Sequence, residues 1–246
     1  MAHGTVADIN DRVTSEPSPI GSGGAEVSIT ETFENMMLKT ELLRGIRALS
    51  LEYPSPFQQK VTLPIINGHD IVVNAQSGSG KTIGFVISAL QRIDTTKFSC
   101  QVLILAPTRE AAQHIKNFVD GLSHFMGIKS CALIGGSRMQ DTVAALEQGC
   151  QLAVGTPGRV LDCVQRILLA TDDIRLVVVD GADEISWNGL ITFVSDILQS
   201  LSKGTQFVLV SPSMPDNVVE LTRKFMLKPL RISVWNENSV QLLEEK

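Results

Sequence analysis

A glycine-rich turn between a short apolar run and a helical pattern is the part of this sequence best suited to chemistry. The turn consists of Ala75, Gln76, Ser77, Gly78, Ser79, Gly80, Lys81 and Thr82. With alanine in the first glycine place, this is the spacing of a phosphate-binding loop, in which backbone N–H groups surround phosphates, the lysine neutralises them and the hydroxyl ligates Mg²⁺. A Gly/Ser turn that ends in Lys-Thr by chance is the alternative, but the flanking strand and helix patterns argue against it. The turn therefore predicts a phosphate site at the start of a helix.

A second apolar run supplies the residue that such a loop needs to hold Mg²⁺. Phosphate loops work together with an aspartate, which usually stands at the end of another apolar strand. Residues 176–179 are Leu-Val-Val-Val, and Asp180 follows them directly. Thr82 and Asp180 are therefore the predicted magnesium partners, largely through bound water.

The elements that must position these residues alternate along the chain. Apolar runs predict strands, and the stretches between them predict helices. The runs lie at 71–73, 101–106, 130–134, 152–155, 176–179 and 207–210. Because they lack inside/outside alternation, we expect an α/β fold with a parallel sheet that is covered by helices on both faces. Such sheets bind ligands beyond the carboxyl ends of their strands, where the turn and Asp180 both lie.

Two helices are predicted ahead of the phosphate loop. Thr40 is a fair N-cap for the first, which has an apolar face. Ser55, Pro56 and Gln58 have the types and spacing of a capping box at the start of the second. The second helix leads through a turn into the strand before the phosphate loop.

Composition limits the class of protein. The 246 residues carry a net charge of −5, which argues against a broad basic surface, so any nucleic-acid contact must be local. Four cysteines without a C-x-x-C pair and four histidines without ligand spacing indicate neither a zinc site nor a disulfide framework. No apolar run is long enough to span a membrane, and the first residues lack the apolar stretch of a signal peptide. We expect an intracellular protein that makes no membrane contact.

Composition also predicts the domain boundaries. Residues 1–30 combine proline, glycine, serine and threonine without apolar periodicity, which predicts a disordered N-terminal tail. No internal repeat or Gly/Pro-rich linker follows. Residues 31–240 are therefore predicted to form one folded domain.

Eight short motifs resemble those of a known family. In chain order they comprise Thr32-Phe33; Pro54, Ser55, Phe57 and Gln58; 75–82; 107–110; Gly135-Gly136; 156–159; Asp180, Ala182 and Asp183; and Ser211 with Ser213. Their order and spacing resemble the N-terminal RecA-like domain of DEAD-box RNA helicases from about Phe33 to about Val234. Segments at 42–46 and 223–229 are similar to the translation initiation factor 4A group of that family. The resemblance implies a RecA-like P-loop NTPase domain, with ATP or ADP and Mg²⁺ as cofactors and single-stranded RNA as partner. It also implies that residues 241–246 begin the family's interdomain linker.

On the nucleotide side, the resemblance implies roles for residues 75–82 and for two residues ahead of them. Lys81 and Thr82 would hold the β and γ phosphates and Mg²⁺. Gln58 would read the adenine edge, and Phe33 would stack on the base. Each has a structural alternative, in which Gln58 only completes the capping box and Phe33 only packs. We favour the functional interpretation, since one amide can serve both roles.

On the RNA side, the resemblance implies contacts to the RNA backbone and a coupling motif. The RNA residues are Pro107, Thr108, Arg109, Gly135, Gly136, Thr156, Pro157, Gly158 and Arg159, and the coupling residues are Ser211 and Ser213. Thr108 and Thr156-Pro157 are also good helix starts, which explains part of each motif without RNA. Helix N-termini and backbone N–H groups can bind phosphates with few basic residues, so RNA affinity of this domain alone should be weak and sensitive to salt.

The family signature Asp-Glu-Ala-Asp is Asp180-Gly181-Ala182-Asp183 in this chain. In the family the glutamate orients and deprotonates the attacking water, and glycine at position 181 has no group that accepts a proton. Asp180 and Asp183 remain as catalytic-site residues without a general base, a loss that costs about 10²- to 10⁴-fold in rate. In the coupling motif, Pro212 stands between the two serines and removes a backbone donor.

Two functions follow from these observations. The first is the ATP-binding half of an RNA helicase of the 4A type, with hydrolysis impaired by Gly181 and by the absence of the family's second RecA-like domain, which it would need in cis or in trans. The second is a non-catalytic paralogue that binds nucleotide, RNA or protein as a regulatory or scaffold module. We expect a monomer in the cytoplasm, with the nucleus as the alternative, and translation initiation scaffold proteins as further partners. Either a domain cut from a longer protein or a naturally short paralogue fits the sequence.

Overall fold

The computed structural model of the chain describes residues 30–76, 78–236 and 239–242. The predicted N-terminal tail, apart from Thr30, lies outside the described residues. The same holds for Ser77 of the phosphate loop and for residues 243–246 of the predicted linker.

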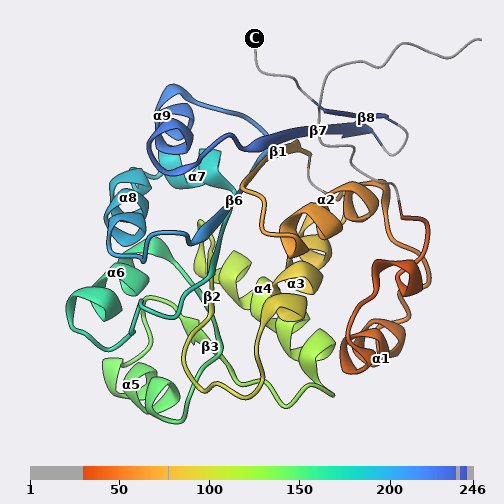
Figure 1. Cartoon of the computed structure of the whole chain (residues 1–246). Helices are drawn as coiled ribbons and strands as arrows, with labels where there is room; N and C mark the ends of the chain where they lie inside the picture. Colours follow the sequence, from red (N-terminus) through yellow and green to blue (C-terminus); the bar gives the residue numbers. More distant parts are fainter. Residues whose placement is uncertain (1–29, 77, 237–238, 243–246) are drawn as a thin grey trace, which may run out of the picture.

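The described part of the chain folds around one sheet, in the strand order β3-β4-β2-β5-β6-β1-β7-β8 (Figure 1). The strands are β1 (Ile71–Ala75), β2 (Val102–Leu105), β3 (Ser130–Leu133), β4 (Leu152–Gly155), β5 (Leu176–Asp180), β6 (Gln206–Ser211), β7 (Leu230–Asn236) and β8 (Ser239–Leu242). Neighbours from β3 to β7 run parallel, which confirms the predicted α/β fold, whereas β8 runs antiparallel to β7. The sequence patterns predict neither β7 nor β8, and β8 spans the predicted domain boundary at residue 240.

Helices cover both faces of this sheet, as the sequence predicts. One face carries η1 (Glu34–Met36), α1 (Thr40–Ala48), α2 (Pro56–Ile66), α3 (Lys81–Arg92) and α4 (Arg109–Ser123). The other carries α5 (Met139–Glu147), α6 (Pro157–Gln165), α7 (Ala182–Trp187), α8 (Ile191–Gln199) and α9 (Asp216–Phe225). In Figure 1 the two groups lie on opposite sides of the strands.

The strands β2, β4 and β5 are almost entirely apolar because each of them faces two cores. Successive side chains of a strand point to opposite faces of the sheet. In β2, Val102 and Ile104 belong to the core under α1–α4, whereas Leu103 and Leu105 belong to the core under α5–α9. This burial on both faces removes the inside/outside alternation that a solvent-facing sheet would show.

The helix starts confirm one prediction and correct another. Gln58 N donates to Ser55 Oγ at 3.3 Å and Ser55 N donates to Gln58 Oε1 at 2.9 Å, so the capping box at the start of α2 is confirmed. Thr40 is not the N-cap of α1, because Lys39 occupies that position. The Lys39 backbone N–H donates to Gln91 Oε1 at 2.8 Å, so a contact with α3 fixes the residue before the helix.

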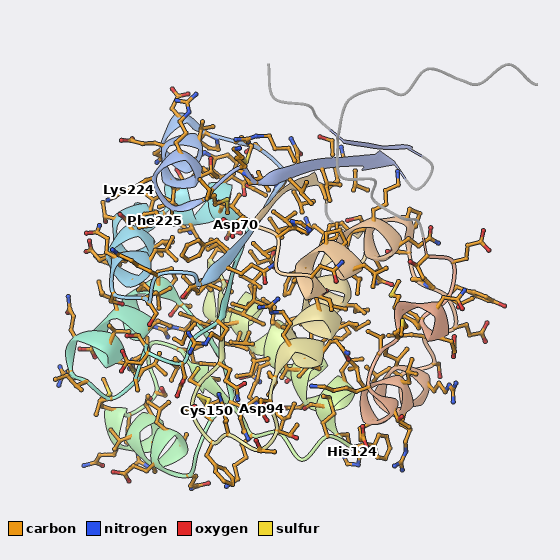
Figure 2. The ribbon with its side chains drawn as sticks, viewed as in Figure 1. Asp70, Asp94, His124, Cys150, Lys224 and Phe225 are labelled. Carbon is orange, nitrogen blue, oxygen red and sulfur yellow. A yellow bond between two sulfur atoms is a disulfide. The ribbon has the colours of Figure 1, made fainter. Side chains whose placement is uncertain are left out.

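Asp70 fixes the start of the strand that leads to the phosphate loop. Its carboxylate accepts hydrogen bonds from Phe207 N at 2.8 Å and from Leu227 N at 3.1 Å, and its carbonyl accepts from Leu230 N at 2.8 Å. These bonds join the chain ahead of β1 to β6 and to the segment between α9 and β7; Asp70 is labelled in Figure 2. As a result, β1 is held between two strands at the point where it enters the sheet.

The cysteines give a further correction. Cys131 of β3 and Cys150, two residues before β4, form a disulfide, so the expectation of no disulfide is wrong for this pair. Their separation of 19 residues matches no sequence motif, and the contact arises only because β3 and β4 are parallel neighbours. Within the described residues, no group of three or more His, Cys, Asp or Glu side chains could hold a metal ion, and no helix has the length and apolar character to cross a membrane.

Candidate nucleotide and RNA site

The phosphate loop joins the end of β1 to the start of α3 at the centre of the sheet. Gly78 and Gly80 adopt left-handed conformations, with φ of 84° and 79°. A Cβ atom on Gly80 would lie 2.8 Å from both Gln58 Nε2 and Ser55 Oγ, so only glycine fits there. No side chain caps the first turn of α3, which leaves its backbone N–H groups for another acceptor. The described part of the loop is compatible with a phosphate site, and phosphate binding stays a prediction.

Lys81 lies at the head of α3 and faces the predicted magnesium partner. Its Nζ donates to the Ala75 carbonyl at 2.8 Å. Burial lowers the pKa of Lys81, and the charges of Asp180 and Asp183 act in the opposite direction. The charges of both carboxylates thus act on the Lys81 ammonium group, although α3 and β5 are about a hundred residues apart in sequence.

Asp180 ends β5 with a strongly perturbed carboxyl group. Burial raises its pKa to about 6, the charge of Lys81 and a hydrogen bond from the Gly181 backbone act to lower it, and Asp183 and Glu184 raise it further. A carboxylate with so little solvent is stabilised by a cation. Together with the Thr82 hydroxyl it forms a hard-oxygen pair that fits Mg²⁺, which takes few protein ligands and binds mainly through phosphates and water.

Asp183 joins this site to the coupling motif. The Ser213 hydroxyl donates to Asp183 Oδ2 at 2.8 Å, and the Asp183 backbone N–H donates to Ser211 Oγ at 3.0 Å. Asp183 and Ser211 are buried. Both predicted coupling residues thus hydrogen-bond to Asp183, Ser213 to its carboxylate and Ser211 to its backbone N–H.

Gly181 lies between Asp180 and Asp183 in the sequence and has a backbone conformation that other residues rarely adopt. Its φ and ψ are 65° and 43°, in the left-handed region. A Cβ atom there would lie 3.1 Å from Cγ of Pro107. The next acidic side chain, Glu184, is exposed on α7. Position 181 therefore carries no carboxylate, and its backbone conformation suits glycine.

Gln58 and Phe33 have structural contacts that favour their alternative roles. Gln58 is buried, its Oε1 accepts from Ser55 N, and its Nε2 donates to the Gly80 carbonyl at 3.2 Å. Gln58 thereby braces the phosphate loop. Phe33 is only 2% exposed and packs in the core under α1–α4, which favours the packing role over stacking on a base. Adenine recognition by these residues stays a prediction.

Most of the predicted RNA residues line one open groove of about 730 Å³. They are Pro107, Thr108, Arg109, Gly135, Thr156, Gly158 and Arg159, and we call this surface the arginine groove. Glu110 of the 107–110 motif also lines it, although it is not among the predicted RNA contacts, and so do Asp162 and Leu190, which lie outside the sequence motifs. Pro157 does not line the groove, because it is buried in the first turn of α6.

The two arginines of this groove are held against the segment that follows β3. A Cβ atom on Gly136 would collide with the Arg109 guanidinium, so the glycine permits this close approach. Arg159 donates from Nη2 to the Ser137 carbonyl at 3.0 Å and from Nη1 to Thr142 Oγ1 at 3.0 Å and Ser137 Oγ at 3.3 Å. The sequence motifs do not include Ser137 and Thr142, since nothing in their spacing links them to Arg159.

A phosphate loop and a strand-end aspartate on a parallel sheet define a RecA-like domain of the P-loop NTPase class. The family model of the DEAD/DEAH box helicase matches residues 55–221. The chain belongs to this family.

Similar proteins and solved structures support this family assignment. The chain is 50% identical over 204 residues to "ATP-dependent RNA helicase eIF4A" of Chaetomium globosum, covering 83% of this chain and 51% of that protein. It is 49% identical over 218 residues to the protein of the same name from Neurospora crassa, covering 87% of this chain and 55% of the relative. A DEAD box protein from Methanococcus jannaschii superposes with a TM-score of 0.80 at 30% identity, over 83% of this chain and 56% of that chain. The chain thus spans about half the length of the curated relatives it matches.

Proposed function

We propose that this chain binds ATP or ADP with Mg²⁺ and, more weakly, single-stranded RNA, as the ATP-binding half of an RNA-dependent ATPase similar to eIF4A. The observation that carries the proposal is the position of Lys81 beside Asp180 and Asp183, at the head of an uncapped helix. A half-buried lysine that is subject to the charge of two carboxylates, at the head of a helix with free N–H groups, suits a phosphate group with a divalent cation.

Each group of the chain has a defined task in this proposal. The backbone N–H groups of residues 78–82 and the Lys81 ammonium hold the phosphates, and Thr82 with Asp180 holds Mg²⁺, largely through water. When bound, Mg-ATP supplies the transferable phosphoryl group and the cation that screens its charge. On binding, Lys81 exchanges its bond to the Ala75 carbonyl for a charge-assisted bond to phosphate.

The chain is proposed to be impaired in hydrolysis. Gly181 has no carboxylate that could accept the proton of an attacking water. The nearby Glu184 is exposed on α7. The loss of a general base costs about 10²- to 10⁴-fold in rate. An arginine that a second RecA-like domain supplies to the phosphates is worth about 10³- to 10⁵-fold in rate, although such contributions do not multiply simply.

The glycine at position 181 also favours a second function, that of a regulatory or scaffold module that binds nucleotide, RNA or protein without catalysis. Its left-handed backbone and its contact distance to Pro107 show a site adapted to glycine. In this function the partners are single-stranded RNA, a second RecA-like domain in cis or in trans, and translation initiation scaffold proteins. We propose a monomer that acts in the cytoplasm, with the nucleus as the alternative.

Thermal unfolding with and without nucleotide tests the proposal. A ligand that binds only the folded state stabilises it by RT ln(1 + [L]/Kd), which is about 2.7 kcal/mol at 100 times Kd. We expect Mg-ADP and Mg-ATP at millimolar concentration to raise the melting temperature of the chain. Mg²⁺ alone is the control for a general salt effect. Melting temperatures that do not respond to either nucleotide would remove the basis of the proposed function.

A further inference from the structure

The disulfide between Cys131 and Cys150 closes the segment that supports the arginine groove. The segment 131–150 contains Gly135 and Gly136, which lie against Arg109, and Ser137 and Thr142, which accept from Arg159. All the described hydrogen-bond acceptors of Arg159 are therefore inside one covalently closed loop.

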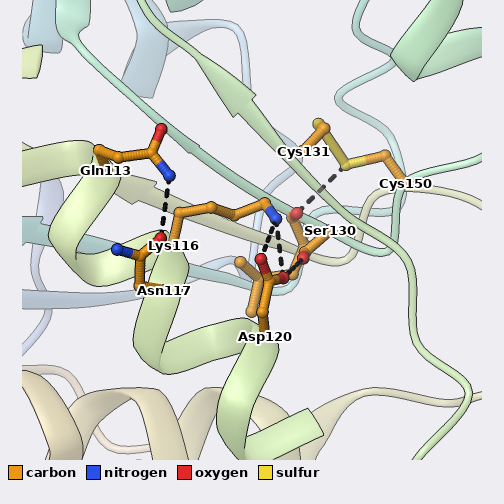
Figure 3. Close-up of polar contacts among 8 residues, drawn as sticks. Gln113, Lys116, Asn117, Asp120, Ser130, Cys131 and Cys150 are labelled. Carbon is orange, nitrogen blue, oxygen red and sulfur yellow. Dashed lines mark hydrogen bonds and ion pairs between the residues drawn. A yellow bond between two sulfur atoms is a disulfide. The ribbon is translucent and has the colours of Figure 1, made fainter. Parts of the chain in front are cut away.

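β3 lies at the edge of the sheet. Within the described residues it pairs with β4 alone, and Leu133 of β3 is buried in the core under α5–α9. On the side of α4, Ser130 Oγ donates to Asp120 Oδ1 at 2.7 Å, and Lys116 Nζ pairs with the same carboxylate, as Figure 3 shows. Asp120 is about half exposed, and ion pairs at exposed carboxylates contribute little. The disulfide therefore adds a covalent restraint to the pairing and burial that position β3 and the segment after it.

The structure also separates this pair from the other cysteines. Cys100 and Cys163 are buried and unpaired. Burial raises the pKa of Cys100 to about 12, and its thiol lies 3.4 Å from the Val102 carbonyl, to which it donates. Neither has a cysteine partner, so oxidation in the described part of the chain is directed to Cys131 and Cys150.

We propose that Cys131 and Cys150 are a reversible thiol–disulfide pair, which sets the rigidity of the segment 131–150 and so the affinity of the arginine groove for RNA; its RNA part rests on the proposed function. In the oxidised form the groove is pre-organised, because Gly135, Gly136 and the partners of Arg159 are held in place. In the reduced form the segment becomes ordered only when RNA binds, and the entropy cost of that ordering lowers the affinity for RNA.

The oxidant is a low-molecular-weight disulfide such as glutathione disulfide. One cysteine thiolate attacks a sulfur of glutathione disulfide and releases a glutathione thiolate, and the second cysteine thiolate attacks the mixed disulfide and releases the other. Two electrons pass from the protein thiols to the glutathione disulfide, and the two cysteine protons end on the two glutathione thiols. Both cysteines are buried, so the reagent enters when the edge strand β3 opens locally.

The test compares the full 246-residue chain after treatment with glutathione disulfide and after reduction with a phosphine. Non-reducing peptide mapping by mass spectrometry identifies the linked cysteines. Melting temperature reports on the restraint, and fluorescence anisotropy with labelled oligouridine at low salt reports on the groove. We expect a peptide that links Cys131 to Cys150, a melting temperature about 5–10 °C higher in the oxidised form, and oligouridine binding about 3- to 10-fold tighter.

Two variants sharpen the comparison. Cys131→Ser combined with Cys150→Ser should abolish both responses, whereas Cys163→Ala should keep them, since Cys163 is buried in the same core without forming the bond. If the double variant does not fold, the two redox states of the unmodified chain still decide the question. Absence of the linked peptide, or equal oligouridine affinity of two forms that both bind, would overturn this proposal alone. Two redox forms that differ in melting temperature but both fail to bind oligouridine would overturn the proposed RNA function and the coupling with it.

Discussion

The nucleotide site and the arginine groove both lie beyond the carboxyl ends of the parallel strands, but different kinds of interaction hold their residues in place. In the nucleotide site, burial shifts the pKa of both Lys81 and Asp180, and the charge of each acts on the pKa of the other. In the groove, Arg109 and Arg159 lie on an open surface and are oriented by neutral groups such as Ser137 and Thr142. Substitutions in the nucleotide site should therefore have large effects on nucleotide binding and stability that depend on pH. Substitutions in the arginine groove should have moderate effects on RNA binding that depend on salt.

The largest effect is expected for Lys81→Ala. The variant removes the charge-assisted bond to phosphate, which is worth about 1.5–3 kcal/mol, so Mg-ADP binding should weaken by about 10- to 150-fold. Isothermal titration calorimetry measures the change. Lys97→Ala, an exposed lysine in the loop before β2, is the matched control and should bind as the unmodified chain does. Equal affinities of the two variants would mean that Lys81 does not contact the ligand.

The next effect concerns the buried Asp180 carboxyl group. Its pKa is raised from 3.8 to about 6 in the folded chain, so the folded state binds more protons than the unfolded state between these values. Stability of the nucleotide-free chain should therefore fall as pH rises from about 4 to 6 and stay lower above it. Asp180→Asn removes this dependence and should be more stable than the unmodified chain at pH 7 by about 1–3 kcal/mol, but not at pH 4. Urea unfolding at both pH values measures the difference; parallel curves for the two proteins would contradict the burial of a charge at this position.

A smaller effect on stability is expected at Gly181, where two substitutions separate conformation from chemistry. Gly181→Ala and Gly181→Glu should each lower stability by about 1–2 kcal/mol, because both place a Cβ in the left-handed region and against Pro107. Only Gly181→Glu supplies a carboxylate, so only it should raise RNA-stimulated phosphate release, and only with a second RecA-like domain present. Stability from urea unfolding and phosphate release from a coupled assay report the two effects. If both variants release phosphate equally, the carboxylate is not the cause.

The smallest effect is expected for Arg159→Ala in the groove. We expect oligouridine binding to weaken by about 1 kcal/mol, and the dependence of log affinity on log salt to become shallower by about one, as for the loss of one phosphate contact. Anisotropy titrations at several salt concentrations give both numbers. Arg175→Ala provides the control, because Arg175 precedes β5 at the opposite edge of the sheet and pairs with Asp173. A fall in affinity without a change in the salt slope would show that Arg159 acts only by holding Ser137.

Much of the fold and the core of the site follow from local sequence. The phosphate loop, the strand ending in Asp180 and the capping box at Ser55 are short patterns whose residues determine their own geometry. Contacts between distant segments do not follow in this way. The Cys131–Cys150 bond depends on β3 and β4 being neighbours, and Lys39 replaces Thr40 as the N-cap because Gln91 of α3 holds its backbone.

The roles of individual side chains were the hardest to predict. Phe33 and Gln58 carry a family pattern, but burial of the ring and the bonds of the amide to Ser55 and Gly80 can be known only from the packed structure. Gly181 is visible in the sequence as a missing carboxylate, whereas its left-handed backbone is not.

The central claim is that the chain binds nucleotide but lacks the group that activates water. The test uses the chain joined to the second RecA-like domain of a family member. Calorimetry measures Mg-ATP binding, and phosphate release is then measured in the same samples with oligouridine. The account predicts saturable binding, with phosphate release about 10²- to 10⁴-fold slower than from the matching Gly181→Glu protein. Saturable binding accompanied by equal rates of phosphate release from the two proteins would contradict it.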